Sequence, residues 1–376
     1  MRCSQMSSFI VMDIVKEAEN YKDCIHFEIG QPDLPPSPKV KQALHVSIDE
    51  NKFSYTQSHG LVELREKIAQ HYQTTYGVTI DIEQIFLTPG TSGAFLIAYA
   101  LTLGKGTTLG FSDPSYPCYK NFAYLLEIHP CFMPIGKEDN FELHVKHLEP
   151  HALDALQISS PANPTGNIYD RENLKSLVTY CEKKNIAFIS DELYHGLTYE
   201  KEASCALEFG SKNVYVINGF SKYYCLPGQR LGWVIVPKEK IRHAEMVAQN
   251  LFICAPTLSQ YGALEAFDDA YLKEIKAEFQ KRRDYLYGEL SQLFDIDAKP
   301  EGAFYIWANV SHYSDDSFSF AKELLENIHI ATTPGVDFGT NGTNCYIRFA
   351  YTRSIEHMRE GVERLKNYLK EKNENQ

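Results

Sequence analysis

The middle of the chain alternates short apolar runs with segments whose apolar residues recur at helical spacing. Four continuous runs, each ended by turn-forming or polar residues, predict buried strands at residues 108–111, 155–159, 186–190 and 214–218. Between two of them, residues 170–184 carry apolar side chains at 174, 177, 178 and 181, the spacing of one helix face. Strand, helix and strand in this order indicate βαβ units and therefore a mostly parallel sheet.

Beyond residue 261 the pattern changes character. A long charged amphipathic helix is predicted first, and shorter strands and helices follow it, at residues 272–293, 302–308, 319–327, 345–350 and 355–369. This pattern indicates a smaller α+β domain, which the proline-rich start of the chain is expected to join. The predicted division is an N-terminal arm with part of the small domain (1–45), a large domain (46–265) and the rest of the small domain (266–376).

Composition and charge narrow the class of protein. The chain has 376 residues, of which 44% are hydrophobic and 23% charged, the balance of an ordinary globular protein with room for two domains. Its net charge of −12 argues against nucleic acid as a partner, because phosphate backbones are met by an excess of Lys and Arg. The absence of a long apolar span and of a signal-like N-terminus predicts no membrane partner. Nine cysteines without a CxxC pair suggest no disulfide framework and no metal site, and scattered thiols favour a cytoplasmic protein.

Polar side chains follow three of the predicted strands directly. Asn163 stands in the loop after residue 159, Asp191 and Tyr194 follow the next strand, and Lys222 follows the last. Each has an ordinary structural explanation when taken singly, as a turn, a helix cap or a solvated surface charge. Because ligands collect beyond the carboxyl ends of parallel strands, however, the loops are expected to bring an amide, a carboxylate, a phenol and an amine to one crevice.

Two glycine-rich segments add a candidate anion site. Residues 228–232 place Arg230 between glycines that let the backbone approach a ligand closely, and residues 88–94 open an apolar helix. A helix N-terminus rich in Gly, Ser and Thr can bind an anion, with plain N-capping as the alternative. Together with the crevice, these segments predict a cup with a phosphate end, a reactive amine and a buried carboxylate.

The segment around Lys222 carries a resemblance to a known family. Ser221-Lys222, followed by five residues and then Gly-x-Arg-x-Gly, resembles the lysine signature of the class I/II aminotransferases, which have pyridoxal 5′-phosphate (PLP) fold type I and belong to the aspartate aminotransferase superfamily. Further landmarks of that family occur in the same order: Ile29-Gly30-Gln31-Pro32-Asp33, Tyr55 with Gly60 and Leu64-Arg65, Asn163-Pro164-Thr165-Gly166, Asp191-Glu192-Leu193-Tyr194 and Tyr346-Ile347-Arg348-Phe349. The similarity covers nearly the whole chain.

The resemblance implies both a fold and an activity. The fold is α/β, with a large domain whose mostly parallel sheet of the seven-stranded type is covered by helices and a smaller α+β domain built from both chain ends. The activity is transfer of an amino group from an α-amino acid to a 2-oxo acid in a ping-pong reaction through pyridoxamine phosphate. The implied protein is a homodimer of amino-acid metabolism that uses PLP.

Five residues match family positions around the cofactor ring. Lys222 is implied to hold PLP through an internal Schiff base and then to carry the proton between Cα and the C4′ carbon. Asp191 is implied to lie against the pyridine nitrogen and keep it protonated. Tyr194 and Asn163 match the hydrogen-bond donors to the phenolic oxygen, and Tyr116 matches the ring that stacks on the cofactor.

The phosphate end is matched by a second group of residues. The resemblance implies that the phosphate is held by Thr91 and Ser92 at the helix start, with Ser221 and Arg230. The guanidinium of an arginine can donate two parallel hydrogen bonds to a phosphate. Tyr55 resembles the tyrosine that reaches the phosphate from the neighbouring subunit, so the resemblance implies a shared site. Family members often have Ser or Thr where this chain has Gly219, so one expected phosphate contact is lost unless Asn218 supplies it.

Arg348 matches the position that binds the substrate α-carboxylate, with Asn163 and the backbone at Gly30 closing over it. Members that select dicarboxylic substrates often carry Lys in the turn where this chain has Ser92 and Gly93, which disfavours an aspartate-type preference. The sequence leaves the amino donor open. Two other functions share these residues: a PLP-dependent C–S β-lyase acting on cystathionine-like substrates, and a non-catalytic PLP-sensing regulator.

Overall fold

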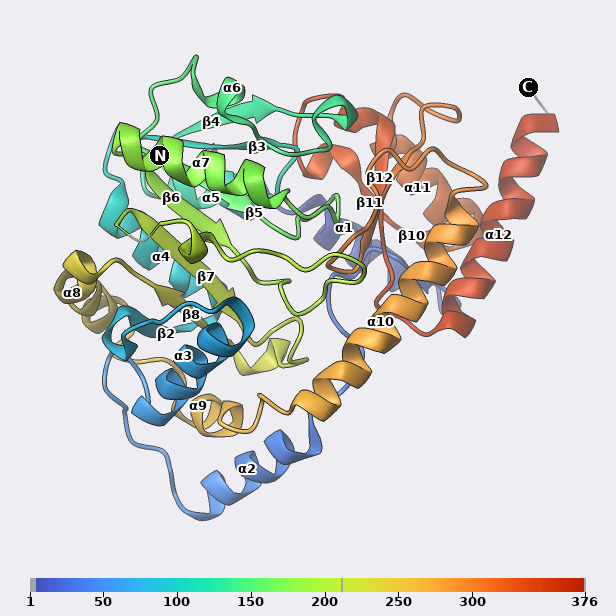
Figure 1. Cartoon of the computed structure of the whole chain (residues 1–376). Helices are drawn as coiled ribbons and strands as arrows, with labels where there is room; N and C mark the ends of the chain where they lie inside the picture. The colour runs from blue at the N-terminus through green and yellow to red at the C-terminus, as the bar shows by residue number, and fades with distance from the viewer. Residues whose placement is uncertain (1–4, 211, 375–376) are drawn as a thin grey trace.

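The core of the protein is a seven-stranded sheet in the order β2-β8-β7-β6-β5-β3-β4 (Figure 1). The computed structural model describes residues 5–210 and 212–374. The strands of this sheet are β2 (Ile85–Pro89), β3 (Thr108–Asp113), β4 (His129–Pro134), β5 (Ala155–Ser159), β6 (Ala187–Asp191), β7 (Val214–Gly219) and β8 (Leu231–Ile235). Neighbouring strands are parallel except at β8, which pairs antiparallel with both β2 and β7. The predicted α/β fold with a mostly parallel sheet is confirmed.

The register of this sheet aligns the polar strand ends. Ser159 at the end of β5 lies opposite Asp191 at the end of β6, and Gly219 at the end of β7 lies opposite Gly232 in β8. The parallel strands β5, β6 and β7 therefore deliver their following loops to one edge of the sheet, as expected for this topology.

Helices cover both faces of the sheet (Figure 1). They are α3 (Val62–Tyr76), α4 (Gly90–Thr102), α5 (Cys118–Leu125), α6 (Val145–Leu148), α7 (Arg171–Lys184), α8 (Ile241–Leu251) and α9 (Thr257–Ala263). The sequence explains the limits of α7: the Asp170 carboxylate accepts from the first-turn N–H groups, and Asn185 ends the helix in the left-handed conformation.

Both ends of the chain meet in two smaller sheets. β1 (Ile25–His26) pairs in parallel with β10 (Ile330–Ala331), and β12 (Tyr346–Ala350) pairs antiparallel with β9 (Tyr305–Asn309) and β11 (Thr333–Pro334). Around them lie α1 (Ile10–Ala18), α10 (Asp269–Leu290), α11 (Ser317–Ile328) and α12 (Ile355–Glu374). α2 (Pro38–Asp49) instead lies against α9, and residue 45 falls inside it. The proposed division into domains stays a prediction.

Some predicted elements differ from the observed ones. The strand expected at 302–308 begins only at Tyr305, because Ala303 has a positive φ of 57° and the chain turns there. β2, β4 and β8 were not predicted from periodicity. The pattern of β4 is obscured by its mixed burial and two prolines, and that of β8 by the glycines beside Arg230. No helix in the described part of the chain is long and apolar enough to cross a membrane.

Candidate active site

Asp191 ends β6 at the edge where the loops converge. Its Oδ2 accepts a 2.5 Å hydrogen bond from the hydroxyl of Tyr119, and its Oδ1 accepts one of 3.2 Å from the backbone N–H of Leu193. Burial raises the pKa of Asp191 to about 6, while these two donors and the charge of Lys222 act in the opposite direction. The site thus holds a buried carboxylate that is poised to accept a positive partner.

Lys222 follows β7 and points its amine into the same crevice. Its Nζ donates a 2.6 Å hydrogen bond to the carbonyl oxygen of Gly30, which lies in the N-terminal part of the chain. Burial, together with the positive charges of Arg348 and Arg230, lowers the pKa of Lys222 to about 8, against the opposing charge of Asp191. An amine with a depressed pKa is a better nucleophile and base near neutral pH than a surface lysine.

Arg348 comes from β12 of the smaller sheet and is buried. Nη1 donates to Oδ1 of Asn163 at 3.0 Å, and Nη2 donates to the carbonyl of Glu28 at 2.8 Å and to Oγ1 of Thr333 at 3.2 Å. Its Nε is buried without a partner, and no ion pair of Arg348 occurs within the part of the chain that the structure describes. A buried guanidinium held by neutral oxygens has its charge available for an anionic ligand.

Aromatic rings enclose this guanidinium. Its centre lies 4.3 Å from the ring centroid of Tyr305 and 4.9 Å from that of Phe338. The Tyr305 hydroxyl is also 2.8 Å from the Tyr194 hydroxyl. A side chain at Gly30 would meet the Tyr305 oxygen at 2.5 Å, so only glycine lets the backbone come this close.

The N-terminus of α4 forms the anion end of the site. The N-cap residue of α4 is Pro89, which makes no side-chain capping hydrogen bond. No N-cap side chain therefore occupies the first backbone N–H groups of the helix, as the alternative of plain N-capping would require. Gly90 has φ +68°, and a Cβ there would collide with the guanidinium of Arg230. A Cβ at Gly232 would stand 2.8 Å from the backbone of Gly90 and from the amide nitrogen of Thr91. The glycines therefore bring a guanidinium against uncapped helix amides, a cradle suited to a phosphate group.

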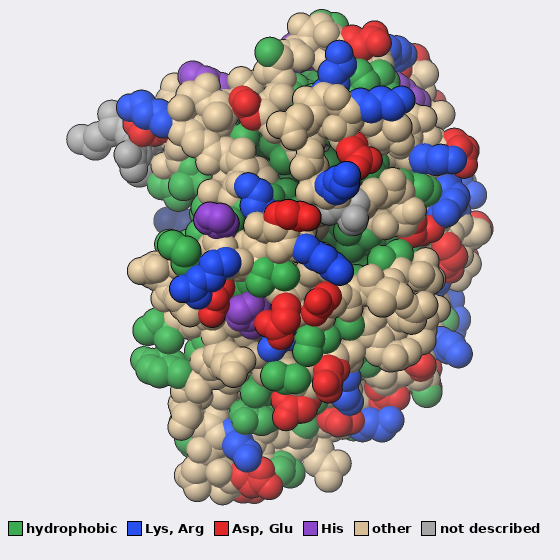
Figure 2. Space-filling model, turned by 60° about the vertical axis from the view of Figure 1, so that its left-hand side comes forward, with side chains coloured by type: hydrophobic (Ala, Val, Ile, Leu, Met, Phe, Trp, Pro, Cys, Tyr) green, Lys and Arg blue, Asp and Glu red, His purple; other side chains and the backbone are tan. Residues whose placement is uncertain are grey.

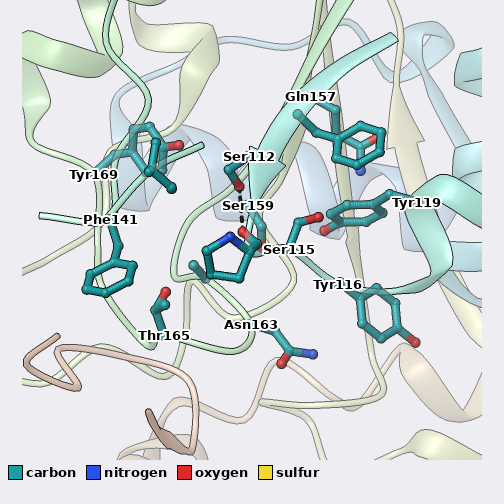
Figure 3. Close-up of a pocket in the computed structure, with 14 residues that line it drawn as sticks. Ser112, Ser115, Tyr116, Tyr119, Phe141, Gln157, Ser159, Asn163, Thr165 and Tyr169 are labelled. Atoms are coloured by element: carbon teal, nitrogen blue, oxygen red, sulfur yellow. Dashed lines mark hydrogen bonds between the residues drawn. The ribbon is translucent and has the colours of Figure 1, made fainter. Parts of the chain in front are cut away.

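Tyr116 and Asn163 lie on the same side of a small cavity between β3, β5 and the loops that follow them (Figure 3). Tyr119 lies beside Tyr116 in this view, and their rings meet edge to face with centroids 5.5 Å apart. Polar side chains continue into the cavity, including Ser159 and Gln157. The region next to Asp191 is therefore walled by tyrosines and lined by neutral polar groups.

The predicted site residues divide into three groups. Gly30, Tyr116, Asn163, Asp191, Tyr194, Lys222, Arg230 and Arg348 are brought together by the contacts and charges described above. Thr91 and Ser92 lie in the first turn of α4, and Ser221 precedes Lys222, but neither serine side chain makes a hydrogen bond within the described residues. Tyr55 is 78% exposed in the loop before α3, apart from the site of its own chain.

Sequence reasoning did not identify Tyr119, Tyr305 or Phe338. Tyr119 had a usable signal, because it stands three residues after Tyr116, which is one helical turn at the start of α5. Tyr305 and Phe338 had no such signal, since only the antiparallel pairing of β12 with β9 and the short helical turn η7 (Gly335–Asp337) bring their rings to Arg348.

Comparison with known proteins agrees with this geometry. A mostly parallel α/β sheet, with a buried amine, a carboxylate and two guanidinium groups beyond its carboxyl edge, is the arrangement of an enzyme of the type I fold. The family model for aminotransferase class I and II matches residues 22–365, and the chain belongs to that family. The predicted family and the predicted aminotransferase activity are thereby confirmed.

Relatives and solved structures cover almost the full length of the chain. A transaminase of Methanocaldococcus jannaschii for (5-formylfuran-3-yl)methyl phosphate is 38% identical, over 98% of each chain. Valine–pyruvate aminotransferase of Mycobacterium tuberculosis is 32% identical, over 96% of each. The crystal structure of an aminotransferase from Mycobacterium tuberculosis superposes with a TM-score of 0.95 at 32% identity, covering 99% of this chain and 98% of that one. These relatives are named as aminotransferases, and they do not favour the β-lyase alternative.

Proposed function

We propose that this aminotransferase uses PLP held by Lys222 to move an amino group from an α-amino acid to a 2-oxo acid. The observation that carries the proposal is the amine of Lys222, whose pKa is lowered to about 8, at one crevice with the buried carboxylate of Asp191 and the guanidinium groups of Arg230 and Arg348. A guanidinium for an anionic group at each end and a carbonyl-reactive amine in the middle match the shape and charge of this cofactor with an amino acid beside it.

The residues present fit the cofactor. Arg230 and the uncapped amides of α4 suit the phosphate, together with the hydroxyls of Thr91, Ser92 and Ser221. Asp191 suits the ring nitrogen, because a carboxylate there holds a proton on that nitrogen. Tyr116 is proposed to stack on the ring, and Tyr194 and Asn163 to bond its phenolic oxygen. When bound, PLP supplies the electron sink for the bond that breaks at the substrate Cα.

Arg348 and Lys222 act on the substrate. The guanidinium of Arg348 binds the α-carboxylate, with Asn163 and the backbone of Gly30 closing around it. Holding the carboxylate orients the Cα–H bond, and this orientation decides which bond breaks. The free amine of Lys222 then moves the proton between Cα and the C4′ carbon as general base and acid.

Borohydride reduction of the holoenzyme followed by peptide mapping tests the cofactor site. We expect the label on Lys222 and no label in Lys222→Ala. A label on another lysine, or none in the wild type, contradicts the assignment.

A half-reaction with an amino acid separates the two activities: loss of the cofactor's initial absorbance without ammonia supports transamination, and stoichiometric ammonia release from cystathionine supports the β-lyase.

The proposed working form is a homodimer with shared active sites, and the cytoplasm is its proposed location. Tyr55 is 78% exposed, and further exposed apolar residues lie on α2, in the loop after α2 and on and after α8: Val46, Ile48, Phe53, Met246, Leu251 and Ile253. Figure 2 brings forward the side of the molecule that carries α8 in Figure 1, and hydrophobic side chains lie exposed there among charges of both signs. Such exposure supports burial against a second copy.

Complementation tests the shared site. Tyr55→Ala and Lys222→Ala are each expected to lose most activity, and mixed dimers of the two variants are expected to regain it, because one site then receives an intact Tyr55 and an intact Lys222. Mixtures that regain nothing although mixed dimers form contradict the role of Tyr55 across the interface. A monomer at assay concentration contradicts the dimer itself.

A further inference from the structure

The chain before α1 is held from two sides. The backbone N–H of Ser7 donates to Oδ1 of Asn121 at 3.1 Å, and Nδ2 of Asn121 donates back to the Ser7 carbonyl at 3.1 Å. The N–H groups of Ile10 and Val11 donate to the carboxylate of Asp337 at 3.2 and 3.3 Å. Asn121 belongs to α5 beside the large sheet, whereas Asp337 belongs to the turn that follows β11 and leads towards β12 of the smaller sheet. Residues 7–11 therefore form a strap between the two parts of the protein.

Phe9 is the side chain at the centre of this strap. Its ring lies nearly parallel to that of Tyr116, with an interplanar angle of 21° and centroids 6.2 Å apart. Phe9 is half-buried, and Ser7 and Ser8 before it are exposed. The two clamps thus place one large apolar side chain against the tyrosine that is proposed to stack on the cofactor.

The other end of the strap leads to Arg348. Asp337 is 4% exposed and close enough to Arg348 for their charges to interact, and the ring of the next residue, Phe338, lies 4.9 Å from the guanidinium centre. Phe9 therefore lies on a segment that contacts the residue proposed for the cofactor ring and is bonded to the turn beside the residue proposed for the α-carboxylate.

We propose that Phe9 is a specificity-determining residue, and that the amino donor or its 2-oxo acid has an aromatic side chain. The proposal rests on the proposed function and deepens it. Phe9 stacks on Tyr116, and the rings of Tyr305 and Phe338 lie over the guanidinium of Arg348. Rings at both residues favour an aromatic group by stacking and edge-to-face contacts.

The charges near the strap disfavour a dicarboxylic substrate. The ionisable group next to Phe9 is the carboxyl of Asp337, which would repel a second carboxylate when ionised. Besides Arg348, which is proposed to bind the α-carboxylate, the cation whose charge reaches Asp337 is Lys120. It lines a different hollow, with Ser7, Asp113 and Thr340, in which neither Phe9 nor Arg348 takes part. A side-chain carboxylate at the proposed position would lack a positive partner there.

Binding of two inert carboxylates to the holoenzyme tests the proposal without requiring turnover. We expect 3-phenylpropanoate to bind at least about tenfold more tightly than maleate. Phe9→Ala should weaken 3-phenylpropanoate about 3- to 10-fold and leave maleate within twofold, and Phe9→Leu should restore part of the loss. Asn121→Ala, which releases the strap but keeps Phe9, should change binding in the same direction. Phe318→Ala removes an exposed phenylalanine on α11 and should change neither ligand.

The same variants in the amino-donor half-reaction separate the two proposals. We expect kcat/KM for L-phenylalanine to fall in Phe9→Ala while that for L-alanine stays within about twofold. Preference for aspartate or maleate in the wild type, or equal losses for both donors in Phe9→Ala, overturns the role of Phe9 and leaves the PLP assignment intact. Failure of Lys222 to take up PLP overturns the proposed function instead.

Discussion

The hydroxyl of Tyr119 donates a 2.5 Å hydrogen bond to Oδ2 of Asp191. Both groups are buried, and the donor counteracts the burial that raises the pKa of Asp191 to about 6. Tyr119 lies in the first turn of α5, directly after the loop that holds Tyr116. One short stretch of chain therefore presents one tyrosine toward the proposed ring face and another to the carboxylate proposed for the ring nitrogen.

Tyr119→Phe is predicted to raise the pKa of Asp191, because the ionised carboxylate loses a donor. A carboxyl group that works in its ionised form supports activity above its pKa and loses it as pH falls. The acid limb of kcat/KM against pH should therefore move to higher pH in the variant. A hydrogen bond to a charged group is worth about 10- to 100-fold, so cofactor affinity should weaken by up to that factor. Isotope-edited infrared titration of the cofactor-free protein measures the carboxyl directly.

Tyr99→Phe is the matched control for that experiment. The Tyr99 hydroxyl is also buried but donates to Gln157 rather than to Asp191. Its removal should lower stability while leaving the acid limb in place. An identical shift in both variants would assign the effect to general loosening of the core rather than to the Tyr119 hydrogen bond.

Lys222 is predicted to react as a free amine at unusually low pH. Its pKa is lowered to about 8, so its unprotonated fraction rises as pH rises through about 8. The rate of its modification by an amine-directed reagent in the cofactor-free protein should have its midpoint there. Arg230→Gln removes a positive charge that lowers this pKa and should move the midpoint upward. Arg242→Gln, on the surface of α8, should not move it.

Gly90→Ala is predicted to damage the anion cradle. The position has φ +68°, and the added Cβ would meet the guanidinium of Arg230, so either the helix start or the arginine must shift. We expect PLP affinity to fall about tenfold or more and the melting temperature to drop. Gly104→Ala meets no atom within 4 Å and serves as the control, for which neither quantity should change much. Equal effects in the two variants would contradict the cradle.

Arg348→Lys is predicted to weaken substrate binding although it keeps the charge. Lysine cannot make the bidentate contact with a carboxylate, and it cannot keep the bonds to Asn163, Glu28 and Thr333 together. KM for the amino donor should rise about 10- to 100-fold. Arg359→Lys on α12 should leave KM unchanged. An unchanged KM in Arg348→Lys would move the carboxylate site elsewhere.

The strands that carry the predicted chemistry were readable from the sequence because they are buried on both faces. The runs that became β3, β5, β6 and β7 are largely apolar, although Gln157 interrupts β5, and each ends at a polar or turn-forming residue. Since parallel strands end at one edge, the convergence of Asn163, Asp191 and Lys222 followed from order alone. The lysine and arginine motif at residues 221–232 is local in sequence, and together with the other ordered motifs it predicted the family.

Contacts between distant segments of the chain could not be predicted from local patterns in the sequence. The hydrogen bond from Lys222 to Gly30 joins residues 192 positions apart, and that from Arg348 to Glu28 joins residues 320 positions apart. Neither hydrogen bond produces a periodic pattern in the sequence, because the pairing of the chain ends through β1 and β10 depends on packing rather than on local propensity. Contacts between distant segments create the environment that lowers the pKa of Lys222. They also bring the hydroxyl of Tyr119 to Asp191, 72 positions further along the chain.

The sequence by itself therefore determined the family, the sheet and the residues with chemical groups, since apolar periodicity and short motifs are local properties of the chain. The tertiary structure decided which groups touch: Tyr119 on Asp191, Tyr305 and Phe338 on Arg348, and Phe9 on Tyr116. These contacts depend on burial and on the meeting of both chain ends, and such non-local packing is not encoded in any short segment.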